Sequence, residues 1–231
     1  MSTNCNIKLS SDELMPILRC APKTPGPLLV IVPSIFGITP DVIEYAGHFQ
    51  QSGALVYALD SFWRIHPGPL SIPSEAPAAL KRMNEVDPET VLSDLLSAIE
   101  HGQKEDLCNG SVVLLGICFG GQYVVQAAEK TSVQGLGSWH GGHLLRVINP
   151  SMLKDVHIQM DFGAEDPLIP MSDVQKIRAL LEHRPNVHIR THPNSGHGFT
   201  HTNAPPHNAN AAEQAKRGVL NLISTFGENV K

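Results

Sequence analysis

Three residues that lie far apart in the sequence offer the groups of a nucleophilic triad: the thiol of Cys118, the carboxylate of Asp166 and the imidazole of His197. Cys118 lies in the sequence Gly-Ile-Cys-Phe-Gly-Gly at residues 116–121, directly after an apolar run. This matches the G-x-nucleophile-x-G pattern of a nucleophile elbow, with sulfur in place of the more usual serine oxygen. The small flanking residues let a strand and a helix meet at a sharp turn, so the motif predicts an exposed, reactive thiol at that turn.

The order of the three residues indicates what this thiol could do. A nucleophile, an acid and a histidine follow one another in this order in hydrolases with a nucleophile elbow. A neighbouring imidazole favours the thiolate, and a carboxylate behind the imidazole fixes its tautomer and stabilises its protonated form. We therefore expect acyl transfer, with Cys118 as nucleophile, Asp166 as acid and His197 as base. Glu165 is the alternative acid.

Attack on an acyl carbon creates an oxyanion that fixed hydrogen-bond donors must stabilise. The backbone N–H of Phe119, the residue after the nucleophile, is one candidate donor. The loop after the first predicted strand supplies the second donor in such folds, and Ile35 is the expected residue.

The elements that must position these residues alternate between short apolar runs and longer amphipathic segments. The runs predict strands at residues 28–32, 54–59, 112–117, 133–139, 156–162 and 187–192, and the segments predict helices at 41–51, 88–100, 172–182 and 209–226. Strands that alternate with helices favour an α/β fold, a parallel sheet with helices on both faces. We expect a single domain over residues 1–231, with the proline-rich stretch 67–77 as an irregular surface loop.

The predicted strands end next to residues with polar or reactive side chains. Functional groups of open α/β sheets gather at the carboxyl ends of the strands, so these residues are expected at one edge of the sheet. They are Ser34, Asp60, Cys118, His140, Asp166 and His197. We expect Ser34, Phe36, Trp63, His140 and His201 to line a substrate pocket at this edge.

The composition excludes several classes of protein. A net charge of −5 gives no basic stripe for nucleic acid, and no apolar stretch approaches the roughly 20 residues that cross a bilayer. Residues 1–8 lack the apolar core of a secretory signal, so we expect a cytoplasmic location with free thiols. The four cysteines show no C-x-x-C spacing, and the twelve histidines form no H-E-x-x-H pair or common zinc framework. We expect neither a metal nor a cofactor.

The motifs together resemble the dienelactone hydrolase family of α/β-hydrolases, also called carboxymethylenebutenolidases. The matching segments are residues 34–37, 60–64, 116–121, 163–170 and 197–199, and they span nearly the whole chain, roughly residues 28 to 226. The resemblance implies an α/β-hydrolase fold and gives Cys118, Asp166 and His197 the family's roles of nucleophile, acid and base.

Two departures from the family pattern concern the substrate. The family has a glutamate at the position of Ser34, where it takes part in activating the cysteine. It has an arginine at the position of His201, where it helps to hold a substrate carboxylate. A second family arginine precedes the elbow, and Lys81 or Arg82 is its candidate counterpart. The resemblance therefore favours a small ester, lactone or thioester without a carboxylate requirement over dienelactone itself.

The expected protein is a monomeric or homodimeric hydrolase that acts on a small molecule through an S-acyl intermediate. Two alternatives remain open at the level of the sequence. The chain could be a non-catalytic descendant of the fold that binds a small ligand or a protein in the pocket that once held a substrate. It could also be a redox sensor that uses a reactive thiolate at Cys118.

Overall fold

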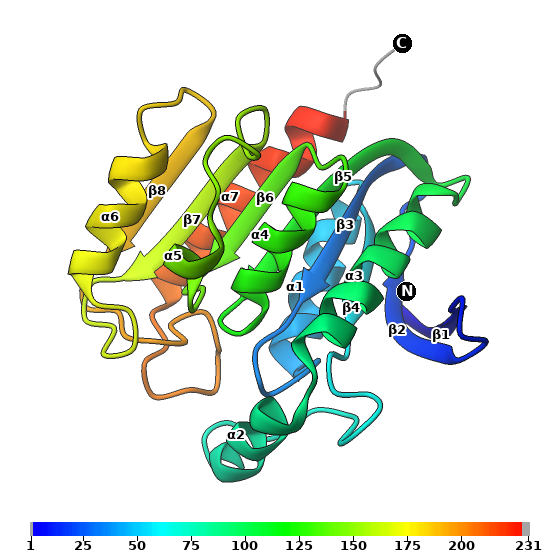
Figure 1. The fold of residues 1–231 in the computed structure, drawn as a ribbon, viewed down its shortest axis with the longest axis horizontal. Helices are drawn as coiled ribbons and strands as arrows, with labels where there is room; N and C mark the ends of the chain where they lie inside the picture. The colour runs from blue at the N-terminus through cyan, green and yellow to red at the C-terminus, as the bar shows by residue number, and fades with distance from the viewer. Residues whose placement is uncertain (1, 228–231) are drawn as a thin grey trace.

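In residues 2–227, which the computed structural model describes, the strands form one eight-stranded sheet with the order β1-β2-β4-β3-β5-β6-β7-β8. Strand β2 pairs antiparallel with both of its neighbours, and β4, β3, β5, β6, β7 and β8 run parallel (Figure 1). The strands are β1 Ser2–Lys8, β2 Leu14–Cys20, β3 Gly26–Val32, β4 Leu55–Leu59, β5 Cys108–Ile117, β6 Gly135–Trp139, β7 His157–Gly163 and β8 Val187–His192.

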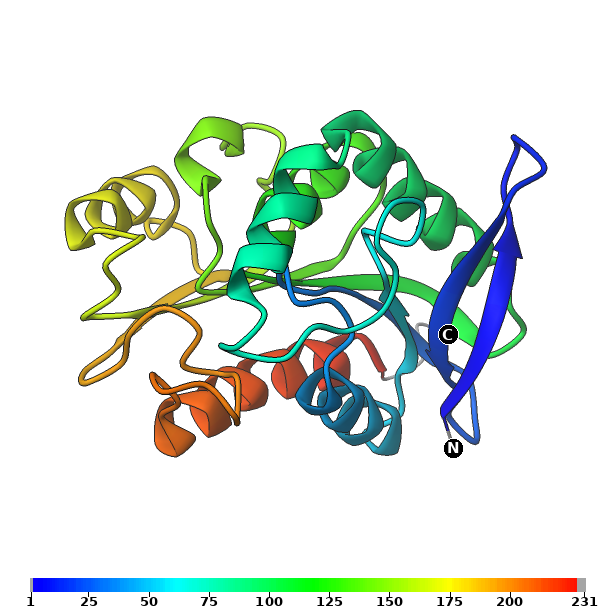
Figure 2. The ribbon, with the colours of Figure 1, turned by 90° about the horizontal axis from the view of Figure 1, so that it is seen from below.

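Helices cover both faces of the sheet. Figure 2 shows α1 and α7 on one face, with α3, α4, α5 and α6 on the other. The helices are α1 Pro40–Gln51, α2 Ala76–Glu85, α3 Pro88–Gln103, α4 Gly120–Lys130, α5 Leu144–Val147, α6 Met171–Leu181 and α7 Ala209–Gly227. The expected α/β architecture is therefore confirmed. Among residues 2–227, no helix combines the length and the apolar character needed to cross a membrane.

The central strands are apolar on both sides because helices cover both sides. Every residue of β3 is buried, and so are residues 112–117 of β5. Their side chains alternate between two core clusters, one against α3 and α4 and the other against α1 and α7. This is the pattern of buried parallel strands, which read as continuous apolar runs.

All six predicted strands and all four predicted helices are present, with ends that differ from the expected ones by a few residues. The sequence did not reveal the hairpin of β1 and β2. Strand β1 is a mostly exposed edge strand whose sequence has no apolar run, and Pro16 interrupts the apolar pattern of β2. Pro16 is tolerated because β2 pairs with β4 only over residues 17–20, so its missing N–H costs no bond in that ladder.

The expectation of an irregular loop over residues 67–77 was only partly correct. The stretch ends in α2, which begins at Ala76 with Pro77 in its first turn, where proline is well tolerated. Helix α2 lies beyond the carboxyl ends of the central strands (Figure 1). The sequence from Ala78 to Met83 consists of good helix formers, and this was the signal that the prolines obscured.

The turn between β5 and α4 depends on the absence of a side chain at Gly120. A Cβ atom there would lie 1.9 Å from the carbonyl oxygen of Val32 in β3, which is backbone that cannot move aside. This close contact seats the start of α4 against the carboxyl end of β3.

We expect Gly120→Ala to lower the free energy of unfolding by about 1–3 kcal/mol or more, the cost of overpacking a closed core. Gly47→Ala is the matched control, because Gly47 lies in α1 with no atom within 4 Å of an added Cβ. That control should be neutral or stabilising by up to about 1 kcal/mol. Denaturant unfolding measures both changes. Equal stability of the two variants would show that the contact at Gly120 does not constrain the turn.

Candidate active site

Cys118 occupies the turn between β5 and α4 in a left-handed backbone conformation, with φ of 52°. Its N–H donates to the carbonyl oxygen of Trp139 at 2.9 Å, and its own carbonyl oxygen accepts from the N–H groups of Gly121 and Gly142. These bonds hold a conformation that is uncommon for a residue with a side chain. The expected nucleophile elbow is therefore present as a geometry, with the thiol at the carboxyl edge of the sheet.

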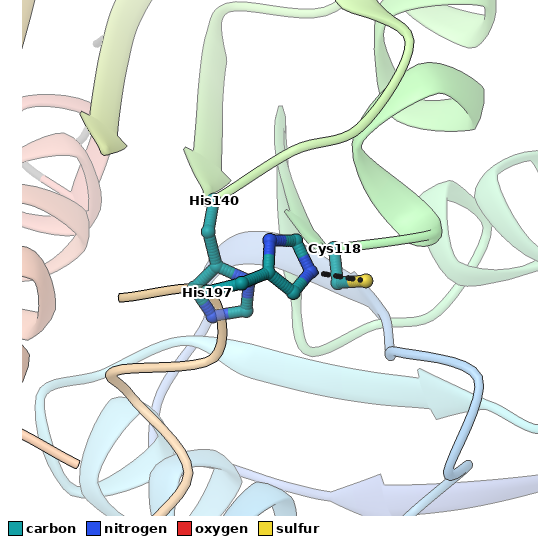
Figure 3. A group of neighbouring side chains, drawn as sticks. All are labelled: Cys118, His140 and His197. Carbon is teal, nitrogen blue, oxygen red and sulfur yellow. Dashed lines mark hydrogen bonds between the residues drawn. The ribbon is translucent and has the colours of Figure 1, made fainter. Parts of the chain in front are cut away.

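Cys118, His197 and Asp166 form a continuous chain of hydrogen bonds. His197 Nε2 lies 3.0 Å from Cys118 Sγ, and His197 Nδ1 lies 2.8 Å from Asp166 Oδ2. Figure 3 shows the imidazole of His197 directed at the sulfur. The other carboxylate oxygen of Asp166 accepts from the N–H groups of Leu168 and Ile169 at 2.8 and 3.1 Å. Because Asp166 is fixed in this way, it can hold the ring of His197 in one orientation.

The environment of His197 favours its protonated form. Burial opposes the charge, but hydrogen bonds and charge attraction from Asp166 and Cys118 outweigh burial and raise the pKa of His197 to about 10. Glu165, the alternative acid, is exposed, whereas the Asp166 side chain is fully buried against His197. The geometry thus selects Asp166 as the partner of the imidazole.

The two expected oxyanion donors lie on neighbouring strands of the sheet. Ile35 follows β3, and Phe119 follows Cys118 at the end of β5; both residues line the same cavity. Neither backbone N–H donates to an acceptor within residues 2–227. These donors are therefore available to a bound group.

Arg82 of α2 fixes the loop that carries Ile35. Its guanidinium is fully buried, and Nε donates to the carbonyl oxygen of Ile35 at 2.8 Å, while Nη1 donates to those of His66 and Gly68. The guanidinium also lies 4.4 Å from the ring centre of Phe62. Arg82 does not line the cavity, so it positions the backbone of this loop and does not contact a ligand there. Lys81 does not line the cavity either.

His140 lies beside the triad at the end of β6. Its ring packs edge-on against that of His197, with 5.0 Å between ring centres, and Nε2 lies 2.8 Å from Thr200 Oγ1. Its Nδ1 atom is buried and makes no hydrogen bond within the described chain. Complete burial, together with the nearby His197 and His201, lowers the pKa of His140 well below its ordinary value. His140 is therefore neutral at physiological pH.

His201 is buried and forms a hydrogen bond with a residue that the sequence did not single out. His201 Nδ1 lies 2.7 Å from Asp41 Oδ2. Burial of Asp41 favours its neutral acid, but the hydrogen bond and charge of His201, with that of Thr39, hold the pKa of Asp41 below its usual range. A charge on His201 is therefore balanced inside the protein. No spacing in the sequence links residues 160 positions apart, so this pair was not predictable.

A cavity of about 830 Å³ lies over Cys118 and His197. Four of the five expected pocket residues line it, namely Ser34, Phe36, His140 and His201. Much of the remaining lining is apolar and comes from segments that the sequence analysis did not assign to the site. These residues are Ile72, Pro73, Ala76, Leu80, Met83, Tyr123, Leu168, Ile169, Ala204, Pro205 and Pro206.

The prediction that Trp63 lines the pocket was wrong. Its indole N–H donates to Asp94 Oδ2 of α3 at 2.9 Å, and the guanidinium of Arg64 stacks on its ring at 4.0 Å. Arg64 also forms an ion pair with Asp94. Trp63 therefore joins the loop after β4 to α3, away from the cavity.

The clustered histidines of the carboxyl-terminal region do not gather at one point. His192 pairs with Asp161, His201 with Asp41, and His207 with the carbonyl oxygen of Phe199. Among residues 2–227, one group of three side chains brings possible metal-ligand atoms within 4.8 Å of one another, and it consists of Cys118, His140 and His197 (Figure 3).

Comparison with protein families identifies relatives over nearly the whole chain. The model of the dienelactone hydrolase family matches residues 16–227. A putative carboxymethylenebutenolidase of Synechocystis sp. is 28% identical over 211 residues, which cover 86% of each chain. Carboxymethylenebutenolidase 1 of Cupriavidus pinatubonensis is 26% identical over 208 residues, again 86% of each chain.

Solved structures share the fold at low sequence identity. A putative dienelactone hydrolase from Klebsiella pneumoniae superposes with a TM-score of 0.81 at 18% identity, over 98% of this chain and 99% of that one. The dienelactone hydrolase-like promiscuous phosphotriesterase P91, from metagenomic libraries, gives a TM-score of 0.77 at 17% identity over 98% of each chain. These similarities establish the α/β-hydrolase fold.

The environment of His197 leads to a prediction for its titration. The ring should keep both protons until the pH approaches about 10, whereas a free histidine loses one near 6.5. Asp166→Asn should move the midpoint to lower pH, because Asp166 is one of the groups that raise it. Glu165→Gln is the matched control and should leave the midpoint in place. Nitrogen-15 NMR of the ring measures these midpoints. A wild-type midpoint near 6.5 would contradict the ion pair between His197 and Asp166.

Proposed function

Because the chain belongs to the dienelactone hydrolase family, we propose that it hydrolyses carboxylic esters, lactones or thioesters through an S-acyl intermediate on Cys118. The observation that carries this proposal is the hydrogen-bonded chain from Cys118 Sγ through His197 to Asp166 Oδ2. Its three groups have the order and the contacts of a nucleophile, a base and an orienting acid. The relatives named carboxymethylenebutenolidase support a hydrolase.

In the acylation step, the Cys118 thiolate attacks the carbonyl carbon of the substrate and a C–S bond forms. The carbonyl π electrons move to oxygen and give a tetrahedral oxyanion. When the oxyanion collapses, the bond from the acyl carbon to the leaving oxygen or sulfur breaks. His197 Nε2 gives its proton to the departing group, and Asp166 keeps the ring aligned for this transfer.

In the deacylation step, His197 is neutral and Nε2 accepts a proton from a water molecule. The water oxygen attacks the thioester carbon of the acyl-enzyme, and the C–S bond then breaks. The products are the carboxylic acid and the thiolate–imidazolium pair of the resting state. The pKa of about 10 for His197 supports a protonated ring beside Cys118 at neutral pH, as this resting state requires.

The oxyanion of both steps fits between the backbone N–H groups of Ile35 and Phe119. Both are free of acceptors within the described chain, and both residues line the cavity that contains the thiol. Arg82 supports the first donor, because its bond to the carbonyl oxygen of Ile35 fixes the orientation of this peptide segment. Preorganised donors of this kind contribute about 3–4 kcal/mol each to transition-state stability.

The cavity favours a substrate with an apolar group. Much of its wall is aliphatic or aromatic, and Ser34 offers a hydroxyl where the family has a carboxylate. His201 is held by Asp41 at 2.7 Å, and Arg146 is the cation of the cavity lining. Ala76, Leu80, Met83 and Asn84 share one face of α2, and this face forms a wall of the cavity. We therefore propose that an acyl or alkoxy group larger than acetyl packs against α2.

Removal of the nucleophile should abolish hydrolysis. With p-nitrophenyl acetate, the wild-type protein should release nitrophenol in a burst followed by slower turnover, and Cys118→Ala should lose both phases. Asp166→Asn should reduce kcat/KM by about 10²–10⁴-fold, because His197 loses its orienting partner. Glu165→Gln, the matched control, should change it less than about twofold. A wild-type rate equal to that of Cys118→Ala would leave the non-catalytic alternative.

The apolar wall of α2 should make hydrolysis depend on chain length. Each methylene that packs against α2 should raise kcat/KM by about fourfold, from about 0.8 kcal/mol of burial. Esters of acetate, butyrate and hexanoate measure this slope. Leu80→Asn should flatten it, because Leu80 lines the cavity while 49% exposed.

Ile43→Asn is the control for Leu80→Asn. Ile43 is similarly exposed, at 41%, but lies on α1 outside the cavity. The Ile43→Asn variant should leave the dependence of kcat/KM on chain length unchanged. A slope that is flat in the wild-type protein, or equally reduced by both variants, would contradict the placement of the apolar group.

A further inference from the structure

His140 is a fully buried imidazole beside the triad that neither step of the proposed hydrolysis uses. Figure 3 shows its ring next to that of His197, at the end of β6. Its Nδ1 atom has no hydrogen-bond partner within residues 2–227, although His140 lines the cavity. A buried polar atom without a partner costs about 1–3 kcal/mol, so its presence calls for a ligand or another role.

Together with Cys118 and His197, His140 offers a donor set for a soft divalent cation. The sulfur of Cys118 and one ring nitrogen each from His140 and His197 lie within 4.8 Å of one another. Thiolate sulfur and imidazole nitrogen are the preferred ligands of Zn²⁺, at about 2.3 and 2.0 Å. A tetrahedral ion at these bond lengths needs its ligand atoms about 3–4 Å apart. The widest separation here must therefore shorten by about 1 Å, which side-chain rotation can provide.

Both imidazoles already have the supporting contacts that metal-binding histidines usually make. His197 Nδ1 is held by Asp166 Oδ2 at 2.8 Å, and His140 Nε2 is held by Thr200 Oγ1 at the same distance. Oxygen partners of this kind fix the tautomer and leave the other ring nitrogen for the metal. The free atoms are then His197 Nε2, which faces the thiol, and His140 Nδ1.

A metal ligand must offer a lone pair, and its proton must be released on binding. His140 Nδ1 is buried and makes no hydrogen bond within residues 2–227, so it is open to a ligand. Cys118 binds as the thiolate. His197 must release its Nε2 proton to solvent, since that nitrogen becomes a ligand. All three residues line the cavity, which can supply a water molecule as the fourth ligand.

We propose that Cys118, His140 and His197 form an inhibitory site for Zn²⁺ or a chemically similar cation. The ion would occupy the sulfur and the ring nitrogen that hydrolysis requires, so binding of metal and acylation of Cys118 exclude each other. Removal of the ion restores the thiolate–imidazolium pair. The inhibitory consequence rests on the proposed hydrolase function, whereas the site itself does not depend on it.

Cobalt and zinc test the site directly in the full-length protein. After treatment with a chelator, Co²⁺ should give the sulfur-to-cobalt charge-transfer absorption and the intense visible bands of a tetrahedral site. Calorimetry with Zn²⁺ in buffers of different ionisation enthalpy should show release of about one proton. Zn²⁺ should also protect Cys118 from alkylation by iodoacetamide, and the chelator should reverse this protection.

Variants assign the ligands. Cys118→Ala should lose the charge-transfer absorption, and His140→Gln should weaken Zn²⁺ binding by about 10-fold or more, within the range for loss of a metal-site group. Cys108→Ala is the control, because Cys108 is another free cysteine, at the opposite end of β5. The Cys108→Ala variant should bind Zn²⁺ as tightly as the wild-type protein does. Circular dichroism tests whether each variant is folded. If His140→Gln does not fold, His140→Asn is used in its place.

The outcomes separate this proposal from the proposed function. Metal binding with the expected spectrum, together with reversible loss of esterase activity, supports both. Metal binding in a protein that hydrolyses no ester supports the site and overturns the hydrolase function. Binding that persists unchanged in Cys118→Ala and His140→Gln overturns the site. Esterase activity that is unaffected when Zn²⁺ saturates the protein overturns the inhibitory role.

Discussion

The geometry of the site depends on one tight turn, in which the chain passes through a left-handed conformation at Cys118 and starts α4 against β3. The contact between Gly120 and the carbonyl oxygen of Val32 leaves no room for a side chain. This contact places the first residues of α4 beside the loop that follows β3, so Phe119 and Ile35 line the same cavity. The thiol and the two proposed oxyanion donors thus share one backbone constraint. Arg82 of α2 adds to this constraint, because its Nε donates to the carbonyl oxygen of Ile35.

A second constraint is the burial of charge around the thiol. The Asp166 side chain is fully buried and that of His197 is 19% exposed, so their hydrogen bonds are only weakly screened by water. Burial alone would keep His197 neutral, yet the hydrogen bonds and charges of Asp166 and Cys118 raise its pKa to about 10. The N–H groups of Leu168 and Ile169 donate to Asp166 Oδ1 and so replace the hydrogen bonds that water would give to this carboxylate. The local backbone therefore supports the charge that the chemistry uses.

The sequence predicted the central sheet and the proximity of the three proposed triad residues because both depend on local patterns. Apolar runs mark buried parallel strands, and parallel strands bring their carboxyl ends together, so Cys118, Asp166 and His197 could be placed at one edge without knowledge of their contacts. The hairpin of β1 and β2 escaped because an exposed edge strand needs no apolar run. Trp63 was misplaced because its position in a loop after a strand does not reveal that its indole N–H meets Asp94. The pair of His201 and Asp41 depends on tertiary packing alone, which no spacing encodes.

The electrostatics of the cavity connect the substrate to the proposed metal site. In the proposed resting state the Cys118 thiolate and the His197 imidazolium balance each other, and His201 lies against the carboxylate of Asp41, while Ser34 adds no charge and Arg146 brings a cation to the lining of the cavity. A substrate carboxylate placed next to the Cys118 thiolate would meet a charge of like sign, so Arg146 is the cation of the lining that such a group would have to use. A divalent cation is instead attracted by the thiolate. It gains the thiolate and two lone pairs and displaces only the proton of His197, so its affinity must increase with pH until that proton is lost. The negative sulfur that repels a carboxylate in the proposed resting state therefore attracts a soft cation.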